Sequence, residues 1–168
     1  PSSAASDVYK RQIGTNSCGS AMFIALNIIG VKPGDKILTN AFTFHAVPSV
    51  IEHARAIPVL VESNREWAMS AEDLDKKAAE TGAKVLLMSY MRGHVPDMDA
   101  VMEVVRKHDL IFIEDCAHAY ETLWNGEFLG TFGDIGCFST QSSKGMSAGE
   151  GGLFITDNDE YAAKAVLY

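Results

Sequence analysis

Residues 110–152 read LIFIEDCAHAYETLWNGEFLGTFGDIGCFSTQSSKGMSAGEGG, and this stretch decides the fold of the chain. An apolar run over residues 110–113 ends in an acidic pair that includes Asp115. A second strand-like run, residues 135–140, is followed by Lys144 and a glycine-rich turn. In open α/β sheets, ligands bind beyond the carboxyl ends of the strands. The stretch therefore predicts a site that combines an acidic group and a lysine.

The rest of the chain alternates helix-like and strand-like segments without a linker. We expect helices from residue 16 or 17 to about 29, over 44–54 and 70–81, from 97 onward, and from 158 to the last residue. We expect strands over residues 36–39, 57–61, 85–88, 110–113 and 135–140. Such alternation implies a mainly parallel sheet with helices on both faces. The predicted fold class is α/β, a three-layer α/β/α sandwich.

Composition limits the classes of function. The 168 residues carry a formal net charge of -8 and are 47% hydrophobic, which suits a soluble domain with a sizeable core. The acidic balance argues against nucleic acid or an anionic membrane as a partner. No apolar run approaches the ~20 residues that span a bilayer. The three cysteines show no metal spacing and suit reduced thiols, so we expect a cytoplasmic protein.

The two ends of the sequence carry a separate expectation. Residues 7–12 read DVYKRQ, which one frame of a common transposon-based sequencing adapter encodes. We therefore expect residues 1–12 to be non-native and the native sequence to begin near Ile13. The last residues read as a helix without a stop signal. Residues 13–168 are then expected to be one domain, truncated at both ends.

The acid and the lysine suit a cofactor with a basic ring nitrogen and an aldehyde. Pyridoxal phosphate is such a cofactor, because a lysine forms a Schiff base with its aldehyde and an acid keeps its pyridine nitrogen protonated. Lys144 lies in an uncharged segment between two strands, although most lysines are solvated surface charges. Asp115 follows four apolar strand residues, where a carboxylate is either exposed at the sheet end or buried and paired; the alternative role is a helix N-cap for the next segment.

Two other kinds of site are weaker. Residues 14–20 have the glycine spacing of a nucleotide-binding P-loop, but Ser20 stands where that motif needs its lysine. This turn can still offer backbone N–H groups to one phosphate, or it can simply cap a helix. Cys116 and His118 are too close in sequence for a convincing zinc pair, so we expect no metal site.

Several motifs, in this order, resemble the DegT/StrS family of sugar aminotransferases, which have the type I fold of pyridoxal phosphate enzymes. They are NSCGSAM at 16–22, AFTF at 41–44, GHVPDMDA at 93–100, EDCAHA at 114–119, GDIGCFS at 133–139 and GEGG at 149–152. The resemblance runs from about Gly14 to the last residue. It implies that residues 13–168 are the cofactor-binding large domain.

The resemblance also implies a role for each residue of the site. The catalytic residues are Lys144, Asp115 and His118, with Asp115 on the ring nitrogen and His118 beside the phenolic oxygen of the cofactor. Phe44 stacks on the ring, and Ser139 binds the phosphate. The expected cofactor contacts are Gly19, Ser20, Phe44, Asp115, His118, Ser139 and Lys144.

The activity that the resemblance implies is transfer of an amino group from glutamate or glutamine to a ketone of a nucleotide-linked keto sugar. The partners are then small molecules, and family members are homodimers with a shared site. Two rivals stay open. One is a pyridoxal phosphate dehydratase, in which histidine replaces the lysine that is present here. The other is a non-catalytic, cofactor-binding relative.

Residues 140–143, which read TQSS, bear on the acceptor. Many nucleotide-sugar aminotransferases of this family carry an aromatic residue and a histidine here. Gln141 instead resembles the branch that aminates cyclitol ketones such as scyllo-inosose, with glutamine as donor. Its carboxamide both donates and accepts hydrogen bonds, which suits a ring of hydroxyls, but it could also only brace the loop. We keep the keto sugar first and the cyclitol as the alternative.

Overall fold

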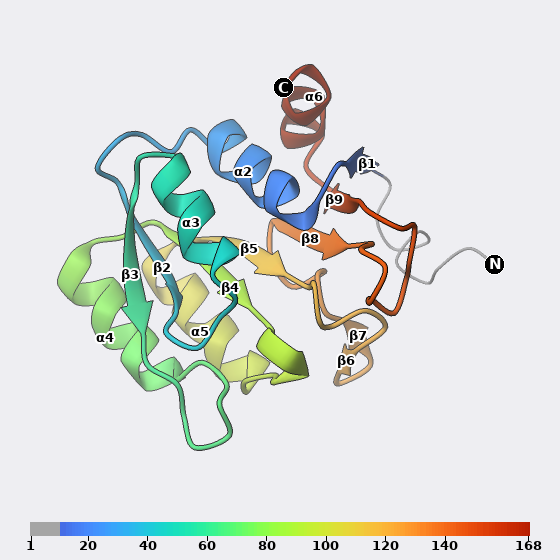
Figure 1. Ribbon diagram of the computed structural model, residues 1–168. Coiled ribbons are helices and arrows are strands. Elements are labelled where there is room, and N and C mark those ends of the chain that lie inside the picture. The colour runs from blue at the N-terminus through green and yellow to red at the C-terminus, as the bar shows by residue number, and fades with distance from the viewer. Residues whose placement is uncertain (1–10) are drawn as a thin grey trace.

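The computed structural model describes residues 11–168, which form a seven-stranded sheet between two layers of helices (Figure 1). The expectation that residues 1–12 are non-native falls mostly on residues 1–10, which lie outside the described residues. Arg11 and Gln12 belong to the first strand, where they pair with the strand that ends at Thr156.

The sheet has the order β1-β9-β8-β5-β4-β2-β3. Its strands are β1 (Arg11–Thr15), β2 (Lys36–Asn40), β3 (Ile57–Val61), β4 (Val85–Ser89), β5 (Ile111–Asp115), β8 (Ile135–Ser139) and β9 (Gly152–Thr156). The five strands from β3 to β8 are parallel, whereas β9 runs antiparallel to both β8 and β1. The carboxyl ends of β4, β5 and β8 therefore meet at one edge.

Helices cover both faces of this sheet (Figure 1). The helices are α2 (Cys18–Ile28), α3 (Ala46–His53), α4 (Ala71–Thr81), α5 (Met98–His108) and α6 (Asp159–Leu167), with a 3-10 turn, η1 (Met91–Gly93). One buried cluster joins α2, α3 and α6 to one face of the sheet, and a second joins α4 and α5 to the other face. The predicted three-layer α/β/α architecture is confirmed.

Local signals explain where the helices begin and end. The Ser70 hydroxyl accepts a hydrogen bond from the backbone N–H of Asp73 and caps α4, which ends at Gly82 with φ of 66°. The Asp97 carboxylate caps α5 through the N–H of Ala100. Both starts agree with the helices expected from residues 70 and 97.

The expectation of a helix over residues 44–54 was wrong at its start. Helix α3 begins at Ala46, and its N-cap residue, His45, makes no side-chain capping bond. Phe44 therefore lies in the loop between β2 and α3 and not inside the helix. The sequence pattern also missed the short antiparallel hairpin of β6 (Leu123–Trp124) and β7 (Glu127–Phe128).

Glu114, which is fully buried, fixes the end of β5. Its carboxylate accepts hydrogen bonds from the Tyr90 hydroxyl at 2.5 Å and from the backbone N–H groups of Gly130, Phe132 and Gly133 at 2.7–2.8 Å. Burial raises the pKa of Glu114, and these four bonds oppose that rise. The network holds the loop before β8 against the strand end that carries the next residue in the chain, Asp115.

Gly152 lies where β9 passes the first turn of α2. A Cβ atom there would lie 2.5 Å from the amide nitrogen of Cys18 and closer still to the carbonyl carbon of Ser17. We expect Gly152→Ala to lower the free energy of unfolding by about 1–3 kcal/mol, because the turn must move. Gly14→Ala is the matched control, because a Cβ on Gly14 in β1 meets nothing within 4 Å. Equal urea midpoints for the two variants would contradict this prediction.

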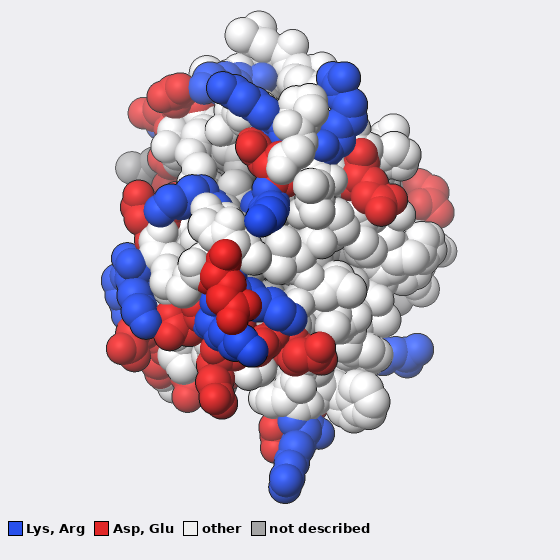
Figure 2. Space-filling view, turned by 90° about the vertical axis from the view of Figure 1, so that its left-hand side faces the viewer, with Lys and Arg blue, Asp and Glu red and all other residues white. Residues whose placement is uncertain are grey.

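No helix among residues 11–168 is long and apolar enough to cross a membrane. The face in Figure 2 carries basic and acidic side chains interspersed, beside a largely uncharged area.

Candidate active site

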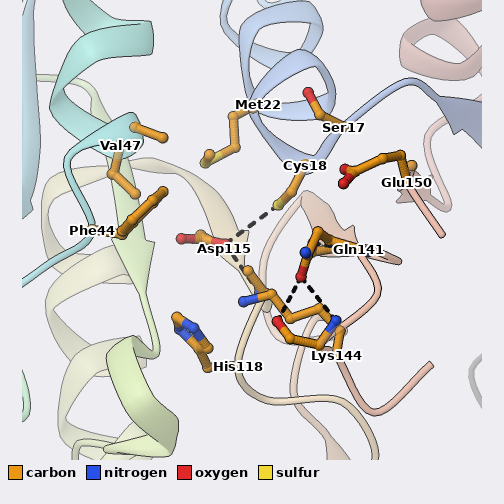
Figure 3. Close-up of a pocket in the computed structure, with 16 residues that line it drawn as sticks. Ser17, Cys18, Met22, Phe44, Val47, Asp115, His118, Gln141, Lys144 and Glu150 are labelled. Carbon is orange, nitrogen blue, oxygen red and sulfur yellow. Dashed lines mark hydrogen bonds between the residues drawn. The ribbon is translucent and has the colours of Figure 1, made fainter. Parts of the chain in front are cut away.

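A pocket of about 450 Å³ opens at the carboxyl ends of β5 and β8, beside the N-terminus of α2. This volume is within the range of about 300–1,000 Å³ usual for small-molecule sites. Six of the seven predicted contact residues line it: Gly19, Phe44, Asp115, His118, Ser139 and Lys144. Figure 3 shows four of them, Phe44, Asp115, His118 and Lys144, facing one space from different parts of the chain.

Asp115 is the last residue of β5 and is 3% exposed. Its Oδ1 atom accepts hydrogen bonds from the backbone N–H of Ala117 at 3.1 Å and from the Cys18 thiol at 3.4 Å. Burial, followed by the charge of Asp115, raises the pKa of Cys18 well above its usual value, so the thiol stays protonated and donates. Within the described residues, Oδ2 has no hydrogen-bond donor, so it is available to a ligand.

The first turn of α2 lies at the same pocket and contains backbone N–H groups without an acceptor among the described residues. Ser17 caps the helix, and its hydroxyl oxygen accepts a hydrogen bond from the backbone N–H of Ser20 at 3.1 Å. Within residues 11–168, no acceptor takes the N–H of Cys18 or Gly19, and both residues line the pocket. Two free N–H groups at the positive end of a helix form a binding site for an anion.

Ser20 is the one predicted contact residue that does not line this pocket. It lines a neighbouring pocket with Phe23 and His53, and its own N–H is already bound to Ser17. The free N–H groups lie one and two residues earlier in the turn.

Lys144 lies in the loop between β8 and β9, and its side chain is half-buried. Its backbone N–H donates to the carbonyl of Gln141 at 2.9 Å, which closes a tight turn. The side chain extends into the pocket between Asp115 and His118 (Figure 3). Among the described residues, its ammonium group has no ion-pair partner.

His118 stands at the exposed side of the pocket, opposite Lys144. Partial burial, together with the positive charges of Lys144 and Arg92, lowers the pKa of His118, while the charge of Asp115 opposes the change. The imidazole is therefore neutral at pH 7 and can either donate or accept a hydrogen bond.

Phe44 and Ser139 complete the predicted set. Phe44 is 49% exposed and presents its ring to the pocket. An exposed aromatic face beside a buried carboxylate can stack on a planar ring. Ser139 ends β8, and its hydroxyl accepts the N–H of Gln141 at 3.4 Å, which leaves its hydroxyl hydrogen free to donate.

Gln141 lines the pocket, but its carboxamide is largely occupied within its own loop. The Oε1 atom accepts hydrogen bonds from the N–H and the hydroxyl of Ser143 at 2.9 and 2.5 Å (Figure 3). The Nε2 atom donates to the Ser142 hydroxyl at 2.9 Å. Gln141 therefore braces the loop that carries Lys144, which is the second of the two roles considered from the sequence.

Several other residues that line the pocket have no role predicted from the sequence. They include Ser17, Cys18, Met22, Val47, Ser143 and Glu150. Ser17 and Cys18 precede Gly19 in the turn already singled out, and Glu150 belongs to the GEGG motif, so both motifs carried a signal. Nothing in the sequence marked Met22 or Val47, because apolar helix residues are usually core.

These groups fit pyridoxal phosphate. The free N–H groups of Cys18 and Gly19 suit the phosphate, and the free oxygen of Asp115 suits a protonated ring nitrogen. Lys144 lies within the same pocket, and Phe44 offers a ring face.

Comparisons with known proteins show which family the sequence of this chain resembles. The family model "DegT/DnrJ/EryC1/StrS aminotransferase family" matches residues 8–168. A protein from Micromonospora echinospora, whose name proposes an L-glutamine:3-amino-2,3-dideoxy-scyllo-inosose aminotransferase, is 35% identical over 85% of this chain and 34% of its own length. GDP-perosamine synthase from Escherichia coli O157:H7 is 34% identical over 82% of this chain and 38% of its own length.

A solved structure gives the same relationship. Spr1654 from Streptococcus pneumoniae, described as a proposed sugar aminotransferase in its PLP form, superposes with a TM-score of 0.88 and 25% identity. The match covers 96% of this chain and 47% of that protein. The chain thus spans less than half the length of these relatives. It belongs to the DegT/DnrJ/EryC1/StrS aminotransferase family.

Proposed function

We propose that the protein containing this chain is a pyridoxal phosphate-dependent aminotransferase that moves an amino group from glutamate or glutamine to a ketone of a nucleotide-linked keto sugar. One observation carries the proposal: Asp115, Lys144 and the free N–H groups of α2 line the same pocket in a member of this family. Lys144 also argues against the dehydratase alternative, in which a histidine takes its place.

The cofactor would be held by residues from four segments. Cys18 and Gly19 would hold its phosphate through their N–H groups, with the Ser139 hydroxyl as a further donor. Phe44 would cover one face of the ring, and Asp115 would pair with the ring nitrogen through its free Oδ2 atom. When bound, the cationic pyridine ring withdraws electrons from the substrate carbon that loses a proton.

The residues of the chain do the proton transfer and the positioning. The Lys144 side chain is flexible, and its neutral amine would take a proton from the substrate carbon as a general base; the ammonium so formed would then give the proton back as a general acid. The Gln141 brace limits the motion of the backbone that carries Lys144. Two hydrogen bonds to Oδ1 fix the Asp115 carboxyl group, which would hold the positive charge of the ring nitrogen in place. Neutral His118 can hydrogen-bond the phenolic oxygen.

The acceptor class rests on two opposing observations. Gln141 is occupied by loop contacts, which weakens the argument for a cyclitol that rested on its free carboxamide. The Micromonospora echinospora relative keeps the cyclitol ketone as a second candidate, and GDP-perosamine synthase supports the nucleotide-linked sugar.

The test is to offer the protein, loaded with cofactor, a nucleotide-linked keto sugar and scyllo-inosose, each with glutamate and with glutamine. Release of 2-oxoglutarate or its amide and amination of the sugar are expected with the nucleotide-linked ketone. Turnover only with an ordinary α-keto acid would refute both candidates. No cofactor binding at all would favour the non-catalytic alternative.

Three further proposals concern the whole protein. Residues 13–168 would be the cofactor-binding large domain of a longer chain, which the greater length of the relatives supports. The protein would act as a homodimer on small molecules, without nucleic acid or membrane as partner. It would work in the cytoplasm, and the three free, buried cysteines support a reducing compartment.

A further inference from the structure

Arg92 lies in the turn that follows β4, next to the chain segment from Asp115 to His118, and it has a conformation that few large residues adopt. Its φ is 54°, inside the turn η1 that follows β4. A non-glycine residue in the left-handed region is strained, and such residues cluster at functional sites. Glycine adopts this conformation without strain, and a glycine with a positive φ does follow at residue 93. The positive φ of Arg92 itself therefore needs an explanation.

The fold places this turn against the residues of the pocket. Tyr90, two residues before Arg92, donates its backbone N–H to the carbonyl of Asp115 at 3.1 Å. A Cβ atom on Gly93 would lie 3.6 Å from the carbonyl oxygen of His118. Arg92 therefore stands between two residues that contact the segment from Asp115 to His118.

The Arg92 side chain is exposed, and among residues 11–168 it has no ion-pair or hydrogen-bond partner. Its charge nevertheless reaches the site, because it contributes to lowering the pKa of His118. The other cation that acts on His118 is Lys144, which the proposed chemistry already uses. Of the two cations that act on His118 among the described residues, Arg92 is thus the one left free to hold an anion.

We propose that Arg92 binds the α-carboxylate of the amino donor and is a specificity-determining residue of this site. The proposal rests on the proposed function, since both donors considered there carry that carboxylate. A guanidinium group can hold a carboxylate through two parallel hydrogen bonds, which fixes the orientation of the amino group beside it. Because the turn that carries Arg92 packs against the segment from Asp115 to His118, a donor bound to Arg92 would lie beside the pocket that holds Lys144.

The kinetic test uses the cofactor-loaded protein and follows the half-reaction with glutamate and with glutamine. Arg92→Gln is expected to raise the half-saturating concentration of both donors about 10- to 100-fold, because one charged hydrogen-bonding partner is lost, while the limiting rate changes little. Arg92→Lys should recover part of the loss. Arg55→Gln is the matched control, because Arg55 is also exposed and has a positive φ of 60°.

Amines without a carboxylate separate this role from a general structural one. For these amines, the half-saturating concentration and the limiting rate of the half-reaction should be the same in Arg92→Gln and in the unmodified protein. An unchanged half-saturating concentration for glutamate would overturn the proposal. A change confined to the nucleotide-linked acceptor would also overturn it, since Arg92 would then bind a phosphate of the acceptor.

A second measurement needs neither cofactor nor activity. The His118 imidazole can be titrated by NMR in the cofactor-free protein, with and without glutarate as a carboxylate probe. Arg92→Gln should raise the pKa of His118, because a nearby positive charge is removed. Glutarate should also raise this pKa in the unmodified protein and leave it unchanged in Arg92→Gln. If glutarate raised the pKa of His118 equally in the unmodified protein and in Arg92→Gln, the proposal would be contradicted. This outcome does not depend on whether the protein has the proposed enzyme activity.

Discussion

Replacing Lys144 with alanine is expected to lower the rate of the amino-transfer half-reaction by about 100- to 10,000-fold. The reason is that Lys144 is the amine of the described pocket placed to move the proton at the substrate carbon, and positioned acid–base groups contribute about this much. Rapid-mixing spectroscopy with a saturating donor measures the rate directly.

The control for this variant is Lys76→Ala. Lys76 is an exposed lysine on α4, on the opposite side of the sheet, and its loss should leave the rate unchanged. Small primary amines added to Lys144→Ala should restore part of the rate, because they supply a mobile proton carrier. A rate within a few-fold of the unmodified protein would assign the proton transfer to another group.

Asp115→Asn is expected to slow the same half-reaction by about 100- to 1,000-fold, with the fold preserved. Asparagine has nearly the same shape but no charge, so it cannot hold a positive ring nitrogen, and losses of one such electrostatic group typically have this size. The readout is again the single-turnover rate, together with the urea midpoint.

Asp134→Asn is a matched control for Asp115→Asn. The Asp134 carboxylate accepts the N–H of Phe112 at 2.8 Å, at the other end of β5. This variant should keep the full rate. If Asp115→Asn also kept the full rate of the half-reaction, the role of holding the ring nitrogen would belong to a different residue.

Much of the fold could be predicted from local signals. Capping residues such as Ser70 and Asp97 and apolar runs such as residues 85–88 act over a few residues, so a pattern identifies them. The antiparallel placement of β9 could not be read in this way, because it depends on pairing with β1, more than a hundred residues away in the chain. The start of α3 at Ala46 was missed because His45 offers no capping side chain.

The site was predictable to the extent that topology brings strand ends together. Asp115 and Lys144 come together because they lie at the carboxyl ends of β5 and β8, which are adjacent parallel strands of one sheet. The sequence could not say which N–H groups of the first helical turn are free, because that depends on the bond from Ser20 to Ser17. It also could not say that Gln141 turns its carboxamide onto its own loop, since residue type does not fix a rotamer.

The central claim is that Lys144 is the residue to which pyridoxal phosphate becomes attached. Borohydride treatment of the cofactor-loaded protein, followed by digestion and mass spectrometry, tests this directly. We expect a single modified peptide, with the added mass on Lys144 and loss of the labelling in Lys144→Ala. A label on another lysine, or no label on a protein that still binds the cofactor, would contradict the account.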